Sequence, residues 1–257
     1  MKKFLKRWLP EVLKAKLRQP RRLAPYAGET YSQEGEDQIL RRIFHGRPIG
    51  FYVDVGAYHP QELSNTFTFY LKGWRGINMD PVPGGMREFN KVRPRDINLE
   101  VAVSEVAGSL TYHQFDTATV NTFSEEVARQ RVEYGDGPNS DFKYRLIGQI
   151  KVEALPLATI LGRHLPPGQR IDLLNIDVEG HEMAVLASND WTKYRPLVVA
   201  IEDSSLLGLD ELPDSAVAKF LTERGYAPFC RTPLTLIFVL RDQLVGTPQG
   251  PRLRAIA

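Results

Sequence analysis

Cysteine is almost absent from this sequence, since Cys230 is the only one among 257 residues. A single cysteine excludes an internal disulfide framework and a zinc site built from cysteine ligands. Long apolar runs are also missing, and no stretch approaches the roughly 20 residues that a membrane-spanning helix needs. The apolar residues near the amino terminus are too interrupted by charge to form the core of a signal peptide. We therefore expect a cytoplasmic protein.

Positive charge is concentrated at the amino-terminal end of the chain. Residues 1–22 contain nine Lys/Arg residues against one Glu, whereas the rest of the chain has 24 basic and 30 acidic residues, a formal charge of −6. A nucleic-acid-binding domain normally presents a basic face. The acidic balance of the main part of the chain argues against nucleic acid as a partner.

Residues 1–25 are predicted to form a basic amphipathic segment that precedes the main domain, residues 26–257. Apolar residues recur there at helical spacing, although Pro10 interrupts them. Two interpretations stay open. Residues 1–22 could make peripheral contact with the inner, anionic surface of a membrane, or they could form a solvated or partner-docked terminal helix.

Strand and helix patterns alternate along the main domain, which predicts an α/β fold with a doubly wound, mostly parallel sheet and helices on both faces. The strands are expected at 51–55, 77–79, 97–104, 171–176 and 196–201, with two more between 226 and 240 that include an antiparallel terminal strand. Residues 106–115 alternate and are expected to add an antiparallel strand. The polar segment 116–148 predicts an irregular insertion that acts as a lid or substrate loop.

The segment GFYVDVGAYHP, residues 50–60, is the centre of the predicted site. Its apolar, β-branched and aromatic residues are typical of a strand buried on both faces. Asp54 lies within this strand, and a buried carboxylate is costly unless something binds it. Gly56 and Ala57 follow and are small enough for a ligand to approach the backbone. Because ligands bind outside the carboxyl ends of such strands, we interpret this turn as the floor of a cofactor site.

Asp80 ends the second predicted strand, 26 residues after Asp54. An acid in this position typically accepts hydrogen bonds from the hydroxyls of an adenosine ribose. A nicotinamide-dependent oxidoreductase of similar architecture is one alternative. It is disfavoured because the turn DVGAYHP lacks the G-x-G-x-x-G spacing for a pyrophosphate.

The segment that leads into the first strand has two interpretations. Ser32 or Gln33 could cap the helix that follows, and acids such as Glu36 and Asp37 suit its first turn. The functional interpretation instead places Gln33 or Glu36 beside the cofactor, because this helix delivers the chain to the strand that begins at Phe51.

A cluster of polar residues follows the strand at 171–176 and supplies the catalytic candidates. Asp177 could orient a substrate hydroxyl or act as a general base, and His181 has a pKa suited to proton abstraction. With Glu202 or Asp203, Asp177 could also bind a divalent cation through oxygen ligands. The alternative for Asp177, as for Glu179 and Glu182, is that it only stabilises a helix N-terminus.

Taken together, several segments resemble the FkbM family of S-adenosylmethionine-dependent methyltransferases over roughly residues 31–203. The matching segments are SQEGEDQIL, FYVDVGAYHP, GWRGINMDP, EVAVSE, NTFS and IDLLNIDVEGHEMAVL. The resemblance implies a Rossmann-like fold, with Asp54, Gly56 and Ala57 at the amino-acid half of S-adenosylmethionine. It places Asp80 at the ribose, and the strand end that contains Val103 and Ser104 at the adenine.

The activity that the resemblance implies is O-methylation of a hydroxyl on a sugar, glycan or related small metabolite. Methyl transfer mainly requires alignment of the reacting atoms and removal of one proton. A further alternative is a binding module that keeps the fold and has lost the chemistry.

Overall fold

The computed structural model describes residues 29–135, 143–247 and 250–254. The chain divides into two compact units, residues 1–30 and residues 31–257. The predicted basic segment, residues 1–25, lies outside the described residues, so both interpretations of residues 1–22, a membrane contact and a solvated or partner-docked helix, stay predictions. Within the described ranges, no helix is long and apolar enough to cross a bilayer.

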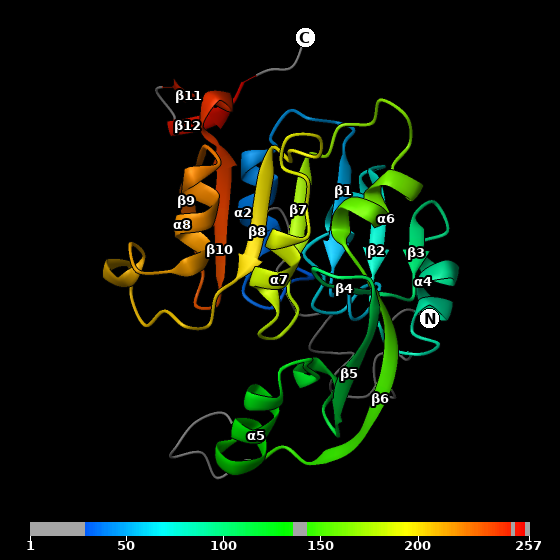
Figure 1. Ribbon diagram of the computed structural model, residues 1–257. Helices are drawn as coiled ribbons and strands as arrows, with labels where there is room; N and C mark the ends of the chain where they lie inside the picture. The colour runs from blue at the N-terminus through cyan, green and yellow to red at the C-terminus, as the bar shows by residue number, and fades with distance from the viewer. Residues whose placement is uncertain (1–28, 136–142, 248–249, 255–257) are drawn as a thin grey trace, which may run out of the picture. The chain divides into compact units, whose positions relative to one another are not determined.

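A seven-stranded sheet forms the centre of the second unit (Figure 1). Its strand order is β3-β2-β1-β7-β8-β10-β9, and β10 runs in the direction opposite to the other six strands. The bounds are β1 Phe51–Val55, β2 Arg75–Met79, β3 Ile97–Leu99, β7 Leu173–Ile176, β8 Val198–Glu202, β9 Tyr226–Arg231 and β10 Thr235–Leu240. The predicted mixed α/β fold with a large, mostly parallel sheet is confirmed.

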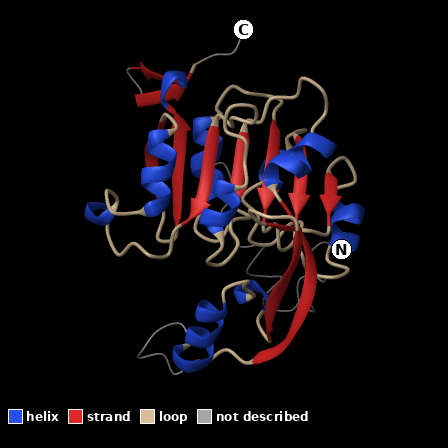
Figure 2. Cartoon of the chain, in the orientation of Figure 1, coloured by secondary structure: helices blue, strands red, loops and turns tan. Residues whose placement is uncertain are grey.

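Helices cover both faces of this sheet (Figure 2). In β1, Val53 faces a cluster formed with α6, α7 and α8, whereas Tyr52 faces a second cluster formed with α2 and α3. This alternation follows from the two-residue period of a strand. The bounds are α2 Glu36–Ile43, α3 Phe67–Leu71, α4 Met86–Val92, α6 Leu157–His164, α7 Glu182–Ala187 and α8 Ala216–Glu223.

A smaller, three-stranded sheet extends from the edge at which the parallel strands end (Figure 1). It consists of β4 Ala102–Val103, β6 Leu146–Leu155 and β5 Gly108–Phe115, in that order. The prediction of one strand over residues 97–104 is therefore wrong. The first strand ends at Leu99, where β3 stops pairing with β2. Ala102 and Val103 then form a second strand that pairs with Ala154 and Leu155 of β6.

The predicted irregular insertion at 116–148 contains regular structure. It includes the short helix η3 Ala118–Val120, the helix α5 Glu125–Tyr134 and the start of β6. Ser124 caps α5, since its hydroxyl accepts a hydrogen bond from the Val127 amide at 3.2 Å. The short helix η4 Leu209–Glu211 precedes α8. After β10 come the short helix η5 Arg241–Gln243 and a hairpin formed by β11 Leu244–Thr247 and β12 Gly250–Leu253.

A fully buried guanidinium, that of Arg93 at the end of α4, lies beneath the first strand. Its Nε donates to Asp96 Oδ2 at 2.9 Å, and its Nη2 donates to Thr66 Oγ1 at 2.9 Å. Thr66 Oγ1 in turn donates to Asp54 Oδ2 at 2.6 Å. The Tyr52 ring lies 5.1 Å from the guanidinium carbon. One buried cation therefore compensates two buried carboxylates.

Replacement of Arg93 by methionine should lower the free energy of unfolding by about 3–5 kcal/mol, because it leaves buried carboxylates without a counter-charge. Denaturant titration measures this change. Arg87→Met, an exposed position on the same helix, should change it by no more than about 0.5 kcal/mol. Equal losses in the two variants would contradict the compensating role of Arg93.

Candidate active site

A cavity opens at the carboxyl ends of the parallel strands, where the strand order reverses between β1 and β7. Ligands bind at such a switch point in open α/β sheets. Its walls come from the start of α2, the turns after β1, β2 and β7, the end of β8, and the segment from β5 to residue 123. Including the solvent at its mouth, it encloses about 1060 Å³.

The wall of this cavity is acidic. Among its described lining residues there is no Lys, Arg or His, whereas seven are acidic: Glu34, Glu36, Asp54, Asp80, Asp177, Glu179 and Glu202. Close carboxylates repel one another, so the ionised form of each is disfavoured. A cationic ligand would relieve this repulsion, and a phosphate-bearing ligand would increase it.

Asp54 is buried below the cavity and is held by two side chains. Thr66 Oγ1 donates to its Oδ2 at 2.6 Å, and Asn175 Nδ2 donates to its Oδ1 at 2.9 Å. Asn65 Nδ2 extends this chain by donating to Asn175 Oδ1 at 3.0 Å. Burial raises the pKa of Asp54, against the opposing charge of Arg93 and these hydrogen bonds. The carboxylate is thus fixed in position before any ligand binds.

Gly56 brings two turns of the backbone into contact. Its φ angle is +81°, and a Cβ atom placed there would lie 1.7 Å from the carbonyl oxygen of Asp177. The Asp177 amide also donates to the Val55 carbonyl at 3.0 Å. The sequence predicted that a small residue here would admit a ligand. In the structure, the space that a side chain at Gly56 would fill is taken by the turn after β7. Ala57 follows Gly56 and lines the cavity.

Asp80 connects the turns after β1 and β2. Its Oδ2 accepts from the Tyr58 amide at 3.0 Å, and its Oδ1 accepts from the Val82 amide at 2.9 Å. Each oxygen keeps a second lone pair. Burial raises the pKa of Asp80 to about 6, although the two backbone hydrogen bonds oppose this shift.

Gln33 and Glu36 both line the cavity, in the position that the functional interpretation gave them. Gln33 is exposed, whereas Glu36 is buried. Glu36 Oε1 accepts from the hydroxyls of Thr232 at 3.2 Å and Thr235 at 3.3 Å, so it ties the start of α2 to the turn before β10. The N-cap position of α2 is Gly35, but the Ser32 hydroxyl accepts a hydrogen bond from the first-turn amide of Asp37 at 3.2 Å, which is the contact that the capping interpretation gave it.

Asp177 and Glu202 form a carboxyl pair at the ends of β7 and β8. Desolvation of the Asp177 carboxyl group by the surrounding cavity wall is the main cause that raises its pKa to about 8, and the charges of Glu179 and Glu182 add to this shift. Burial and the charge of Asp177 also raise the pKa of Glu202. A hydrogen bond between the two carboxyl groups raises the pKa of Glu202 and lowers that of Asp177. The direction of these two shifts makes Glu202 the donor of this hydrogen bond and Asp177 its acceptor, and Asp177 lies at the solvent-exposed edge of the cavity.

The insertion is anchored to the turn after β7 through Glu179. Arg131 of α5 donates to Glu179 Oε2, and Thr122 Oγ1 donates to the Glu179 carbonyl at 2.7 Å. Glu179 has a φ angle of +55°, which is uncommon for a residue other than glycine. This anchorage brings Tyr112, Asn121 and Phe123 to the wall of the cavity.

In a comparison with protein-family models, residues 54–228 match the methyltransferase FkbM domain. This match covers more than half of the chain and includes Asp54, Asp80, Asp177 and Glu202. The chain belongs to the FkbM methyltransferase family. It is therefore a methyltransferase, as the sequence motifs predicted. Comparisons with curated proteins and with solved structures found no match.

Several predicted site residues of this FkbM domain do not line the cavity. Val103 packs in the core, and Ser104 Oγ pairs with His181 Nε2 at 3.2 Å. Burial lowers the pKa of His181. The carboxylate of Asp203 accepts hydrogen bonds from the hydroxyls of Ser205, at 2.5 Å, and Ser215, at 2.6 Å. The cofactor-binding, catalytic and metal-binding roles given to these residues stay predictions.

Three carboxylates of the FkbM domain lie close enough to share a cation. Asp177, Glu179 and Glu202 each place an oxygen within 4.8 Å of the others. Hard divalent cations prefer such oxygen ligands. Two of the predicted metal candidates, Asp177 and Glu202, are thus brought together. Glu182, for which a stabilising role was the alternative, accepts hydrogen bonds from the amides of Val178 and Gly180 in the turn before α7.

Sequence reasoning missed some of the residues that build this site. Asn65 and Thr66 lie in the turn before α3, and Arg131 lies in the segment predicted to be irregular. The sequence signal for α5 was present, because Ser124 followed by Glu125 and Glu126 is typical of a helix start.

The pair of Asp177 and Glu202 should make stability fall as pH rises. Raised pKa values mean that the folded chain keeps protons that the unfolded chain releases above about pH 4. The melting temperature of the double variant Asp177→Asn/Glu202→Gln, minus that of the parent, should therefore increase as the pH is raised from 5 to 9.

Glu126→Gln provides the matched control for this pH series. A hydrogen bond from Arg129 lowers the pKa of Glu126, so the ionised form is stabilising and the variant should lose stability relative to the parent above about pH 4. If the double variant and the control follow the same trend, the carboxyl pair does not share a proton.

Arg131→Met should loosen the insertion. The partly buried hydrogen bonds of Arg131 to Glu179 and to the Val120 carbonyl are of a type that contributes about 1.5–3 kcal/mol. Amide hydrogen exchange in α5 should accelerate at least about tenfold. Arg129→Met removes exposed ion pairs from the same helix and should have a smaller effect. Equal protection in both variants would contradict this anchorage.

Proposed function

We propose that this chain is an S-adenosylmethionine-dependent methyltransferase that methylates a hydroxyl oxygen on a sugar, glycan or related small metabolite. The observation that carries the proposal is the acid-lined cavity at the switch point of the sheet. If the seven strands are numbered in chain order, the sheet reads 3-2-1-4-5-7-6. Two parallel halves that diverge from a central switch point are typical of a Rossmann-like fold.

The charge of the cavity supports this cofactor over a dinucleotide. S-adenosylmethionine carries a sulfonium and an ammonium group, and both are favoured by surrounding carboxylates. A nicotinamide dinucleotide carries a diphosphate, which needs backbone amides at a glycine-rich turn or cationic side chains. The turn after β1 has Gly56 packed against Asp177 and has no such spacing. The oxidoreductase alternative is therefore disfavoured on charge as well as on sequence.

Asp54 and Asp80 are the residues we assign to the cofactor, because they end consecutive strands and line the same cavity. Asp80 is positioned by two backbone amides and retains acceptor capacity for the ribose hydroxyls. Asp54, Gly56 and Ala57 line the part of the cavity assigned to the amino-acid half. Gln33 and Glu36 complete this wall from the start of α2.

Asp177 is the residue we assign as the general base. The bound cofactor supplies an electrophilic methyl group, and a hydroxyl acceptor must lose one proton as it is methylated. A pKa near neutrality suits Asp177 to take this proton, and Glu202 stabilises the pair by donating a hydrogen bond to it. We give His181 no such role in this proposal, because it contacts Ser104 and does not line the cavity.

The acceptor is assigned to the side of the cavity formed by the insertion. Tyr112 and Phe123 lie there with their ring centroids 4.7 Å apart, and Asn121 adds a polar group. Aromatic surfaces with a few polar groups are typical of small-molecule sites. The oxygens of Asp177, Glu179 and Glu202 give an alternative form of the site, in which a divalent cation would replace the proton shared by Asp177 and Glu202 and orient the acceptor hydroxyl.

Calorimetry with S-adenosylmethionine and with nicotinamide dinucleotides tests the cofactor directly. The parent chain should bind the first and not the second. Asp80→Ala should weaken binding at least tenfold, because the carboxylate that orders the turns after β1 and β2 is lost. Glu100→Gln, a nearby exposed acid outside the cavity wall, should bind as the parent does. Tight binding of a dinucleotide would overturn the proposal.

Incubation with labelled cofactor and a fractionated extract of the source cell tests turnover. A labelled small molecule or glycan should form with the parent chain, and its formation should fall at least about a hundredfold in Asp177→Asn. Cofactor binding without any labelled product would favour the inactive binding module.

A further inference from the structure

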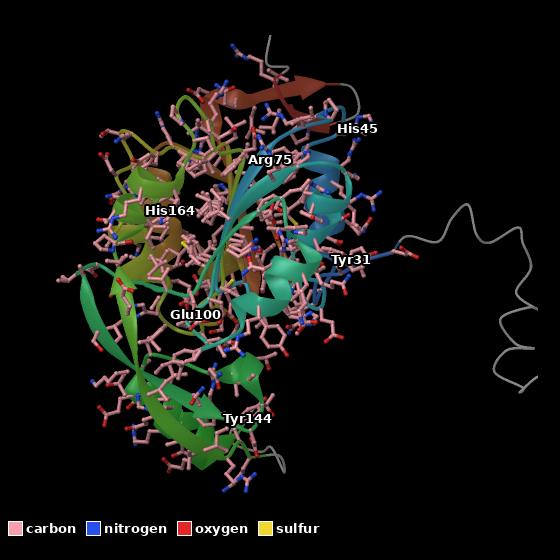
Figure 3. All side chains as sticks on the ribbon, turned by 90° about the vertical axis from the view of Figure 1, so that its right-hand side faces the viewer. Tyr31, His45, Arg75, Glu100, Tyr144 and His164 are labelled. Carbon is pink, nitrogen blue, oxygen red and sulfur yellow. The ribbon has the colours of Figure 1, made fainter. Side chains whose placement is uncertain are left out.

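A second groove lies at the end of α2 that is remote from the cavity. It is lined by the last turn of α2, the loop that follows it and Lys72 at the end of α3. The described lining residues include no acid, and five are basic: Arg41, Arg42, His45, Arg47 and Lys72. In Figure 3, His45 and Arg75 lie toward one end of the domain, and Glu100 and Tyr144 lie toward the other.

Helix capping explains only part of this cluster. Basic residues in the last turn of a helix interact favourably with its dipole, which accounts for Arg41 and Arg42. It does not account for the approach of two helix ends that both carry cations. The pKa of Lys72 is lowered first by burial and then by the charge of Arg41, although Asp37 opposes this.

Arg47 is a groove cation that is already neutralised. Arg47 forms an ion pair with Asp172, whose other oxygen accepts from the Phe51 amide at 2.8 Å. Arg41 has a neutral partner, since its Nη1 donates to Gln38 Oε1 at 2.9 Å. We therefore expect a bound anion to have its most favourable electrostatic interaction with Arg41 and Lys72.

Two exposed aliphatic residues are sequence neighbours of residues that line the groove. Ile49 is 74% exposed and directly follows Pro48, and Leu71 is 57% exposed and directly precedes Lys72. Single exposed aliphatic residues are common. Aliphatic residues beside clustered cations are typical of surfaces that lie in a membrane interface, where lipid tails cover the first and anionic headgroups attract the second. A small soluble anion would use the cations alone.

We propose that this groove and its rim form a docking surface for anionic membrane lipids. Headgroup phosphates enter between Arg41 and Lys72, while Ile49 and Leu71 enter the interface beside them. The surface is built from residues 38–72 alone, and it does not depend on the identity of the cofactor or the acceptor.

Cosedimentation of the full chain with vesicles tests this surface. The vesicles contain phosphatidylcholine alone or with about one third phosphatidylserine. Arg41→Gln/Lys72→Gln should lower binding to the anionic vesicles at least tenfold, because each basic residue near such a surface contributes about fivefold. Ile49→Ser/Leu71→Ser should also lower it, by at least threefold, without changing its dependence on salt.

The matched control removes the same charge from the opposite face of the sheet. Arg163→Gln/Lys219→Gln alters exposed cations of α6 and α8, leaves residues 1–22 unchanged, and should bind as the parent does. Equal binding by the groove variant and this control would overturn the proposal. Unchanged melting temperatures exclude unfolding as the cause of any loss.

A competition experiment separates a membrane surface from a site for a small anion. Inorganic phosphate should displace the chain from anionic vesicles no more than sodium chloride of equal ionic strength does. Selective displacement by phosphate, together with undiminished vesicle binding of Ile49→Ser/Leu71→Ser, would assign the groove to a soluble phosphate compound and overturn the membrane proposal.

Discussion

The buried guanidinium of Arg93 is the interaction on which the candidate site depends. A charge inside a protein is tolerated only when it is paired and hydrogen-bonded. Arg93 reaches Asp96 directly and Asp54 through Thr66, so the floor of the cavity and the turn after α4 share one neutralising group. Because Asp54 lies in β1 and pairs in register with Asn78 and Asn175, this compensation fixes the central strand at the point where the cavity opens.

The close approach of two turns gives the cavity its shape. Only glycine at position 56 allows the Asp177 carbonyl to lie against the end of β1. Asp177 is thereby held at the edge of the same cavity as Asp54 and Asp80, while Glu202 reaches it from β8. The insertion then closes one side through Arg131 and Glu179. The backbone thus places acids from four neighbouring strands around one space, which a purely local pattern does not require.

Much of this arrangement could be predicted from sequence, since it follows from strand periodicity. The runs that end at Asp54, Asp80 and Asp177 identified parallel strands, and parallel strands bring their carboxyl ends to one edge. Other features depend on tertiary contacts. Residues 97–104 form two strands because β4 finds a partner in β6, about 50 residues later. His181 contacts Ser104 and does not line the cavity, and no spacing in the sequence encodes this direction of its side chain.

The acidity of the cavity links ligand binding to protonation. Desolvation and mutual repulsion raise the pKa values of Asp80, Asp177 and Glu202, so the cavity holds protons near neutral pH that isolated carboxyl groups would have released. A cation bound among these groups favours their ionised forms and lowers the same pKa values. Binding of a cationic ligand therefore releases protons, and its affinity increases with pH over the range in which these groups titrate. A neutral ligand would lack this coupling, because the protonation of the wall would not change its electrostatic energy. The same carboxyl groups that make the unliganded fold less stable at high pH thus make it selective for a positively charged partner.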